Sequence, residues 1–113
     1  MKVIEKNPGR KIEYEASGTK LFLGDDEIML NLAKYQKDWP VHLDVCCNRD
    51  EMLMVGTGDG LYYVAQIDIP EIQYKDVEEG AESGSTPLPL DMKKVVLTLW
   101  SLDELTPSPI EEN

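Results

Sequence analysis

Residues 61–69 read LYYVAQIDI, and this stretch decides the fold. Its side chains alternate between two sets: one face carries Leu61, Tyr63, Ala65, Ile67 and Ile69, and the other carries Tyr62, Val64, Gln66 and Asp68. This period of two predicts a β-strand with one apolar face and one mixed face. Pro70 has no N–H to donate to a neighbouring strand, so regular pairing is expected to end there.

A hairpin is the natural interpretation of the residues that precede this strand. Residues 52–55, MLMV, are apolar and lead into GTGDG at 56–60. Glycines reach the positive φ values that a tight reversal requires. We therefore expect 52–55 to pair with 61–69 across the glycine-rich turn.

Six further segments are expected to be strands, because they alternate or are rich in β-branched residues and lie between turn-forming residues. They are 1–6, 11–17, 21–23, 27–32, 41–47 and 93–102, and 71–74 is expected as a short edge segment. In the segment 11–17, Ile12, Tyr14 and Ala16 share one side, which predicts a half-buried strand. In the last segment, Val95, Leu97 and Leu99 share one face.

Residues 27–35 also fit the period of a helix. We expect a strand over 27–32, with one short helical turn near 33–38. The whole pattern predicts an all-β fold, a small antiparallel sandwich or barrel of about seven strands.

The length of 113 residues fits one domain, expected over 1–102. The net charge of −11 comes from 22 acidic and 11 basic residues, but nine of the acids and none of the bases lie in the two tracts 76–91 and 103–113. The rest of the chain is therefore nearly balanced. The first tract is also rich in Gly, Pro and Ser and is expected to be a mobile acidic loop, and the second an acidic C-terminal tail.

Composition also predicts which partners and compartments do not fit. Acidic tracts repel phosphate groups, so neither nucleic acid nor a membrane surface is expected as a partner. No apolar run approaches the roughly 20 residues of a membrane-spanning helix, and the N-terminus lacks the apolar segment of a signal peptide, so a cytoplasmic protein is expected.

Cys46 and Cys47 are adjacent and cannot link distant segments. We expect Cys47 to be a core residue and Cys46 a half-exposed thiol.

The candidate catalytic and metal-binding residues lack the partners that their chemistry requires. His42 and Asp44 share one face of a strand, as a base and its orienting acid do in hydrolases, but no motif places a nucleophile beside them. The two cysteines lack the spacing of a zinc site. The acids at 25–27, 50–51 and 59 lack the spacing of a calcium loop and are common turn formers. We therefore expect no enzyme, no metal and no cofactor.

A contact surface is the more interesting candidate. If 93–102 pairs with 61–69, Tyr62, Val64 and Gln66 lie near Val96, Thr98 and Trp100, and aromatic rings with polar edges are favoured at such surfaces. The candidate ligand- or partner-binding residues are Trp39, Tyr62, Gln66, Thr98 and Trp100. The alternative is that a second sheet covers this face as core, which is the more common outcome.

The order of several phrases along the chain resembles a group of proteins. These phrases are KNPGRKIEYE, YQKDWPVHLDVC, GLYYVAQIDIP and LPLDMKKVVLTLWSL, with an acidic variable loop before the last. Together they are similar to short uncharacterised bacterial proteins encoded in prophage-like or other mobile elements. The resemblance implies a small accessory or structural protein and supplies no catalytic residues.

Two functions are therefore expected as alternatives. The first is a non-enzymatic structural or protein-interaction domain that binds a protein partner or itself, and the resemblance implies that it belongs to a phage-derived assembly. The second is a domain that binds a small ligand or carbohydrate in an aromatic pocket lined by Trp39, Tyr62 and Trp100.

Overall fold

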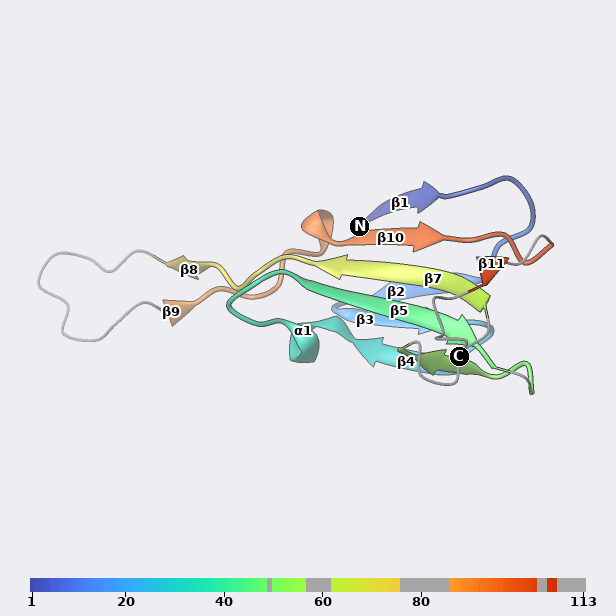
Figure 1. Ribbon diagram of the computed structural model, residues 1–113. Helices are drawn as coiled ribbons and strands as arrows, with labels where there is room; N and C mark the ends of the chain where they lie inside the picture. The colour runs from blue at the N-terminus through green and yellow to red at the C-terminus, as the bar shows by residue number, and fades with distance from the viewer. Residues whose placement is uncertain (49, 57–61, 76–85, 104–105, 108–113) are drawn as a thin grey trace, which may run out of the picture.

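The computed structural model describes the chain except for residues 49, 57–61, 76–85, 104–105 and 108–113. Its largest sheet contains, in spatial order, β1 (Lys2–Glu5), β10 (Val96–Leu99), β7 (Tyr62–Ile69), β5 (Val41–Cys47) and β6 (Leu53–Val55) (Figure 1). A short strand, β11 (Thr106–Pro107), also pairs with β7, beyond the end of β10. The all-β class is confirmed.

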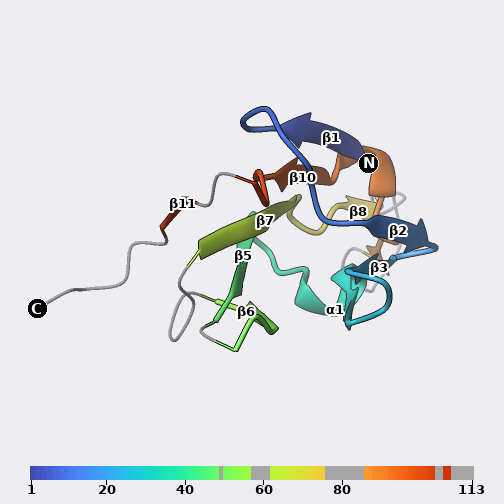
Figure 2. The same cartoon turned by 90° about the vertical axis from the view of Figure 1, so that its right-hand side faces the viewer.

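A second, three-stranded sheet contains β2 (Tyr14–Ser17), β3 (Lys20–Leu23) and β4 (Ile28–Asn31). It lies on one side of the large sheet, behind β5 and β7 in Figure 1 and to the right in Figure 2. The two-residue strands β8 (Tyr74–Lys75) and β9 (Thr86–Pro87) pair with each other away from both sheets. Neither α1 (Leu32–Tyr35) nor the 3₁₀ turn η1 (Met92–Lys94) is long and apolar enough to cross a membrane, and no other helix occurs in the described ranges.

The apolar core lies between the large sheet and the three-stranded sheet. The three-stranded sheet contributes side chains that are almost fully buried at Leu21, Leu23 and Leu30. The large sheet contributes Val45, Ala65, Ile67, Ile69, Leu97 and Leu99. Two sheets thus share one core, which is the arrangement of a sandwich.

Several sequence predictions are confirmed within this core. The alternation predicted for 61–69 is confirmed in its second half, where Ala65, Ile67 and Ile69 are buried on one face. Val95, Leu97 and Leu99 are buried together, as the shared face in 93–102 predicted, and β10 pairs with β7. The short helical turn also forms, as α1, directly after β4.

The expected hairpin between 52–55 and 61–69 is wrong. β6 pairs with β5 in the register Val45↔Val55 to Cys47↔Leu53, whereas β7 pairs with β5 on its other edge. The cause is a tight turn at Asn48, whose side-chain Oδ1 accepts hydrogen bonds from the backbone N–H groups of Asp50 and Met52 at 2.8 and 3.1 Å. This turn returns the chain onto β5 before the glycine-rich segment begins.

Pairing at the other edge of the large sheet also departs from the expectation of antiparallel strands. β1 runs parallel to β10, with Lys2 beside Val96 and Glu5 beside Leu99, whereas every other described pair is antiparallel. The chain passes from β1 through the three-stranded sheet before it reaches the large sheet again, so β1 and β10 are not joined by a hairpin.

Three segments differ from the predictions in their burial or in their bounds. All four residues of β2 are exposed, because β2 is the edge strand of the smaller sheet and only Ile12, before it, reaches the core. Residues 92–94 form η1 instead of extending the last strand, since Asp91 Oδ1 accepts the backbone N–H of Lys93 at 3.0 Å. The loop expected over 76–91 is too long at its end, where Leu90 is buried; its residues 76–85 lie outside the described part of the chain.

The two faces of β10 predict different costs for shortening neighbouring side chains. Leu97→Ala is expected to lower the free energy of unfolding by about 2–5 kcal/mol, because it leaves a cavity between the sheets. Val96→Ala removes similar atoms from the half-buried opposite face and is expected to cost less than about 1 kcal/mol. Urea denaturation measures both values. Equal losses would contradict the assignment of the faces.

Candidate functional site

The candidate site is the face of the large sheet that points away from the three-stranded sheet, here called the outer face. In the described part of the chain no second layer covers it (Figure 1, Figure 2). Cross-strand register places its side chains in rows; the first row is Lys2, Val96, Asp68 and His42, and the second is Ile4, Thr98, Gln66 and Asp44. These side chains are half-buried or exposed, so the outer face is not core.

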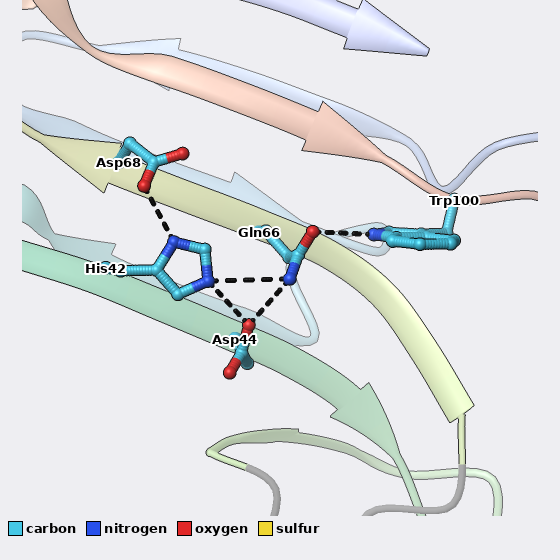
Figure 3. A network of polar contacts seen from close by, with 5 residues as sticks. All are labelled: His42, Asp44, Gln66, Asp68 and Trp100. Atoms are coloured by element: carbon cyan, nitrogen blue, oxygen red, sulfur yellow. Dashed lines mark hydrogen bonds and ion pairs between the residues drawn. The ribbon is translucent and has the colours of Figure 1, made fainter. Parts of the chain in front are cut away.

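His42 lies between two carboxylates on the outer face (Figure 3). Its Nδ1 is 2.7 Å from Oδ1 of Asp68, on β7, and its Nε2 is 2.8 Å from Oδ1 of Asp44, on its own strand. The hydrogen bond with Asp68 is the largest cause that raises the pKa of His42 above 6.5, and partial burial opposes it; the bond with Asp44 raises the pKa further. The sheet geometry thus favours an imidazolium at this position.

Gln66 connects this group to Trp100. Its Nε2 donates a hydrogen bond to Oδ1 of Asp44 at 2.9 Å, and its Oε1 accepts one from the indole Nε1–H of Trp100 at 3.0 Å (Figure 3). The amide of Gln66 therefore has both of its ends engaged. We call His42, Asp44, Gln66, Asp68 and Trp100 the His42 network.

The indole of Trp100 is held on its faces as well as at its edge. It stacks on Tyr63 with ring centroids 5.1 Å apart and an angle of 21° between the planes. The ammonium of Lys6 lies 5.7 Å from the centroid of the indole, within the range of a cation–π interaction. Contacts within the chain therefore fix the orientation of the ring.

A bulge in β7 explains why Tyr63, and not Tyr62, lies beside Trp100. Ala65 pairs with Val45 but Tyr63 pairs with Cys46, so Val64 is an extra residue on β7. Val64 itself is buried in the core, and Tyr63 and Tyr62 exchange the faces expected for them, so the expected position of Tyr62 beside Gln66 is wrong. Cys46, expected to be half-exposed, is fully buried opposite Tyr63.

The structure brings three of the five sequence-predicted site residues together. Thr98 pairs with Gln66, and Trp100 is bonded to Gln66. Trp39 precedes β5 and is 62% exposed. Trp39 lies near the pair Val41↔Ile69, whereas the backbone N–H of Trp100 donates to the carbonyl of Val64 at 3.0 Å. Ile69 and Val64 are five residues apart along β7, a separation of roughly 16 Å. Trp39, Tyr62 and Trp100 therefore do not line a common pocket.

The outer face also contains site residues that the sequence analysis missed, namely Asp68, Tyr63 and Lys6. Asp68 shares a strand face with Gln66 in the sequence. Once β5 is known to pair with β7, this shared face places Asp68 beside His42. The parity of Tyr63 carried no such signal, since nothing in LYYVAQIDI marks where the extra residue lies.

The arrangement around His42 differs from that of a catalytic base. A general base needs a ring nitrogen within reach of the substrate, and here both nitrogens contact carboxylates. Burial raises the pKa of the Cys46 thiol to about 11, so it is not activated as a nucleophile. Among the described residues, no group of three or more His, Cys, Asp or Glu side chains could hold a metal ion.

The acidic turns that were weighed as metal ligands have other roles. Asp25 and Asp26 both adopt positive φ in the turn between β3 and β4, a conformation that Asp tolerates. Glu27 Oε2 accepts the backbone N–H of Leu53 at 2.8 Å and so connects this turn to β6. Asp59 lies outside the described residues.

Comparison with known proteins identifies no relative: no family model matches the chain, and neither a curated protein nor a solved structure is significantly similar to it. The outer face is therefore interpreted from its own geometry.

The position of His42 predicts how stability depends on pH. A histidine whose pKa is higher in the folded than in the unfolded chain stabilises the fold fully below the unfolded value of about 6.5, and this stabilisation is lost as pH rises through the folded-state pKa. His42→Gln is therefore expected to reduce the free energy of unfolding at pH 5.5 more than at pH 8.5. Urea denaturation of both proteins at the two pH values measures the difference, which cancels the titration of all other groups. A difference that grows with pH would refute the arrangement.

Gln66 is expected to be the link that fixes Trp100. Gln66→Ala removes the acceptor of the indole N–H and is expected to cost about 1 kcal/mol of stability. In a Trp39→Phe background, where Trp100 is the sole tryptophan, its fluorescence should shift to longer wavelength. Gln73→Ala is the matched control, because Gln73 is exposed and its side-chain amide donates to the carbonyl of Glu71, two residues away, with no other hydrogen bond to the residues that the structure describes. An unchanged spectrum in Gln66→Ala would count against the link.

Proposed function

We propose that this chain is a non-enzymatic protein-interaction domain that contacts its partner through the outer face of the large sheet. The single observation that carries the proposal is the ordered indole of Trp100 at the end of an uncovered sheet face. Protein contact surfaces are enriched in aromatic residues, and tryptophan is prominent among the residues that dominate binding energy. An indole that is already fixed loses little conformational entropy on binding.

The composition of the outer face supports a protein partner. Ile4, which is 39% exposed, and the half-buried Val96 provide apolar area beside the uncharged Thr98. Two charged side chains flank this strip in the row of Val96, Lys2 on one side and Asp68 on the other. An apolar centre with a polar border is the usual anatomy of a protein interface.

The geometry of the reactive side chains supports a role without catalysis. Both ring nitrogens of His42 are occupied, and the pKa of the Cys46 thiol is raised. The rings of Trp39 and Trp100 lie at different ends of the sheet, so no observation favours the aromatic pocket of a small-ligand binder. The resemblance to proteins of prophage-like elements adds the proposal that the partner belongs to an assembly, either another protein or a second copy of this chain.

A photo-crosslinking amino acid placed at one position on each sheet tests the proposal. The test position is Thr98, at the centre of the outer face, and the control is Met29, which is 48% exposed on the three-stranded sheet. In bacterial cells that express the full chain, we expect a discrete crosslinked protein from position 98 and none from position 29. Light scattering of the purified chain shows whether that partner is a second copy.

Binding measured with the purified partner completes the test. Thr98→Arg is expected to weaken the affinity at least tenfold, about 1.4 kcal/mol, because it places a long charged side chain in the uncharged strip. The control Met29→Arg is expected to leave affinity within about twofold. Equal crosslinking from both positions, or equal loss of affinity in both variants, would refute the outer face as the contact surface.

A further inference from the structure

His42 is the only histidine in the chain, and it lies on the outer face, in the same row as Val96 and Asp68. Its contacts join two strands, since Asp68 belongs to β7 whereas His42 and Asp44 belong to β5. Both carboxylates can only accept hydrogen bonds when they are ionised, so His42 must donate from both ring nitrogens to satisfy them at 2.7 and 2.8 Å. Only the protonated imidazole has two N–H groups.

Loss of that proton has a defined consequence at Gln66. The neutral ring keeps one N–H, and Asp68 needs it more, because Asp44 also accepts from Gln66 Nε2 at 2.9 Å whereas Asp68 has no other side-chain donor among the described residues. The lone pair of His42 Nε2 then faces the Asp44 carboxylate and repels it. Gln66 Nε2 already lies 3.4 Å from that nitrogen and can donate to it after a small rotation.

We propose that His42 is a pH-sensitive clamp of the outer face: protonated, it holds Asp44 and Asp68 and fixes Gln66 against Trp100, and deprotonated, it releases Asp44 and draws the Gln66 amide away from Trp100. The proposal rests on the proposed function in one respect only, that the outer face is the surface through which the domain binds. The rearrangement itself requires no partner.

The titratable and charged groups that face His42 come from its own strand and from the strands on the β7 side of it. On its own strand Asp44 faces it directly, and Cys46 beyond has a pKa of about 11 and stays neutral. On β7 it faces Asp68 and the uncharged Gln66, and the pKa of Tyr63, further along, is raised above 10 by burial and by Asp44. Across β10, which contributes Val96 and Thr98, the nearest base in the same row is Lys2 on β1, about 10 Å from β7.

Nuclear magnetic resonance of the full chain, with the Trp39→Phe substitution to leave one indole, tests the clamp without any partner. The ring signals of His42 are expected to titrate with a midpoint above 6.5, and the indole N–H signal of Trp100 and the side-chain amide of Gln66 are expected to move with the same midpoint. In His42→Gln the indole signal should be constant between pH 5.5 and 8.5.

A second variant pair separates the clamp from general charge effects. Asp68→Asn is expected to move the His42 midpoint downward towards 6.5, because it replaces the carboxylate that raises the pKa of His42 most with an uncharged amide. Asp26→Asn removes one negative charge from a remote turn, at a positive φ that Asn also tolerates, and should leave the midpoint unchanged. An indole signal that ignores the titration of His42, or equal shifts in the two variants, would overturn the clamp.

These results are independent of the crosslinking outcome, so failure of the clamp and failure of the proposed function are distinguishable. With the purified partner in hand, affinity for the wild-type chain is expected to fall as pH rises through the His42 midpoint, and affinity for His42→Gln to be constant over the same range. A pH-independent wild-type affinity would refute the regulation of binding even where the clamp itself is seen.

Discussion

The pairing of β7 on both of its edges is the constraint on which the rest of the structure depends. One edge is hydrogen-bonded to β5, and the other is bonded first to β10 and then to β11. A strand paired on both sides cannot slide, because a shift of one residue would carry Ile67 and Ile69 out of the core. The same pairing places Gln66 and Asp68 on the outer face, so one set of backbone hydrogen bonds positions the core and the His42 network together.

The bulge at Val64 divides β7 into two parts with opposite parity. On one side of it, Gln66 and Asp68 point outward; on the other side, Tyr63 does. If the same sequence alternated regularly through Val64, the ring of Tyr63 would lie on the core side and Trp100 would lack its stacking partner. Bulges often re-aim side chains beside functional sites, and here the bulge completes the aromatic end of the outer face.

The two faces of the large sheet have different energetic roles. Side chains such as Leu97 and Val45 are fully buried, and their packing supplies most of the stability that a chain of this size can obtain. The His42 network is partly exposed, so solvent screens its ion pairs and their contribution to stability is small. Its stronger effect is to restrict where Gln66 and Trp100 point. A surface of this kind can respond to protonation without unfolding the core beneath it.

The sequence by itself determined the all-β class, the faces of the regular strands and the helical turn after β4, because alternation and turn chemistry are local properties of the chain. Val95, Leu97 and Leu99 could be assigned to the core for that reason.

Only the tertiary structure decided which strands pair. Residues 53–55 are apolar enough for either neighbour, and the capped turn at Asn48 selected β5. The meeting of His42 with Asp68 and the place of Tyr63 depend on that pairing and on one unmarked bulge. Both are cross-strand relations, and the alternation of a single strand carries no information about the register of its neighbour.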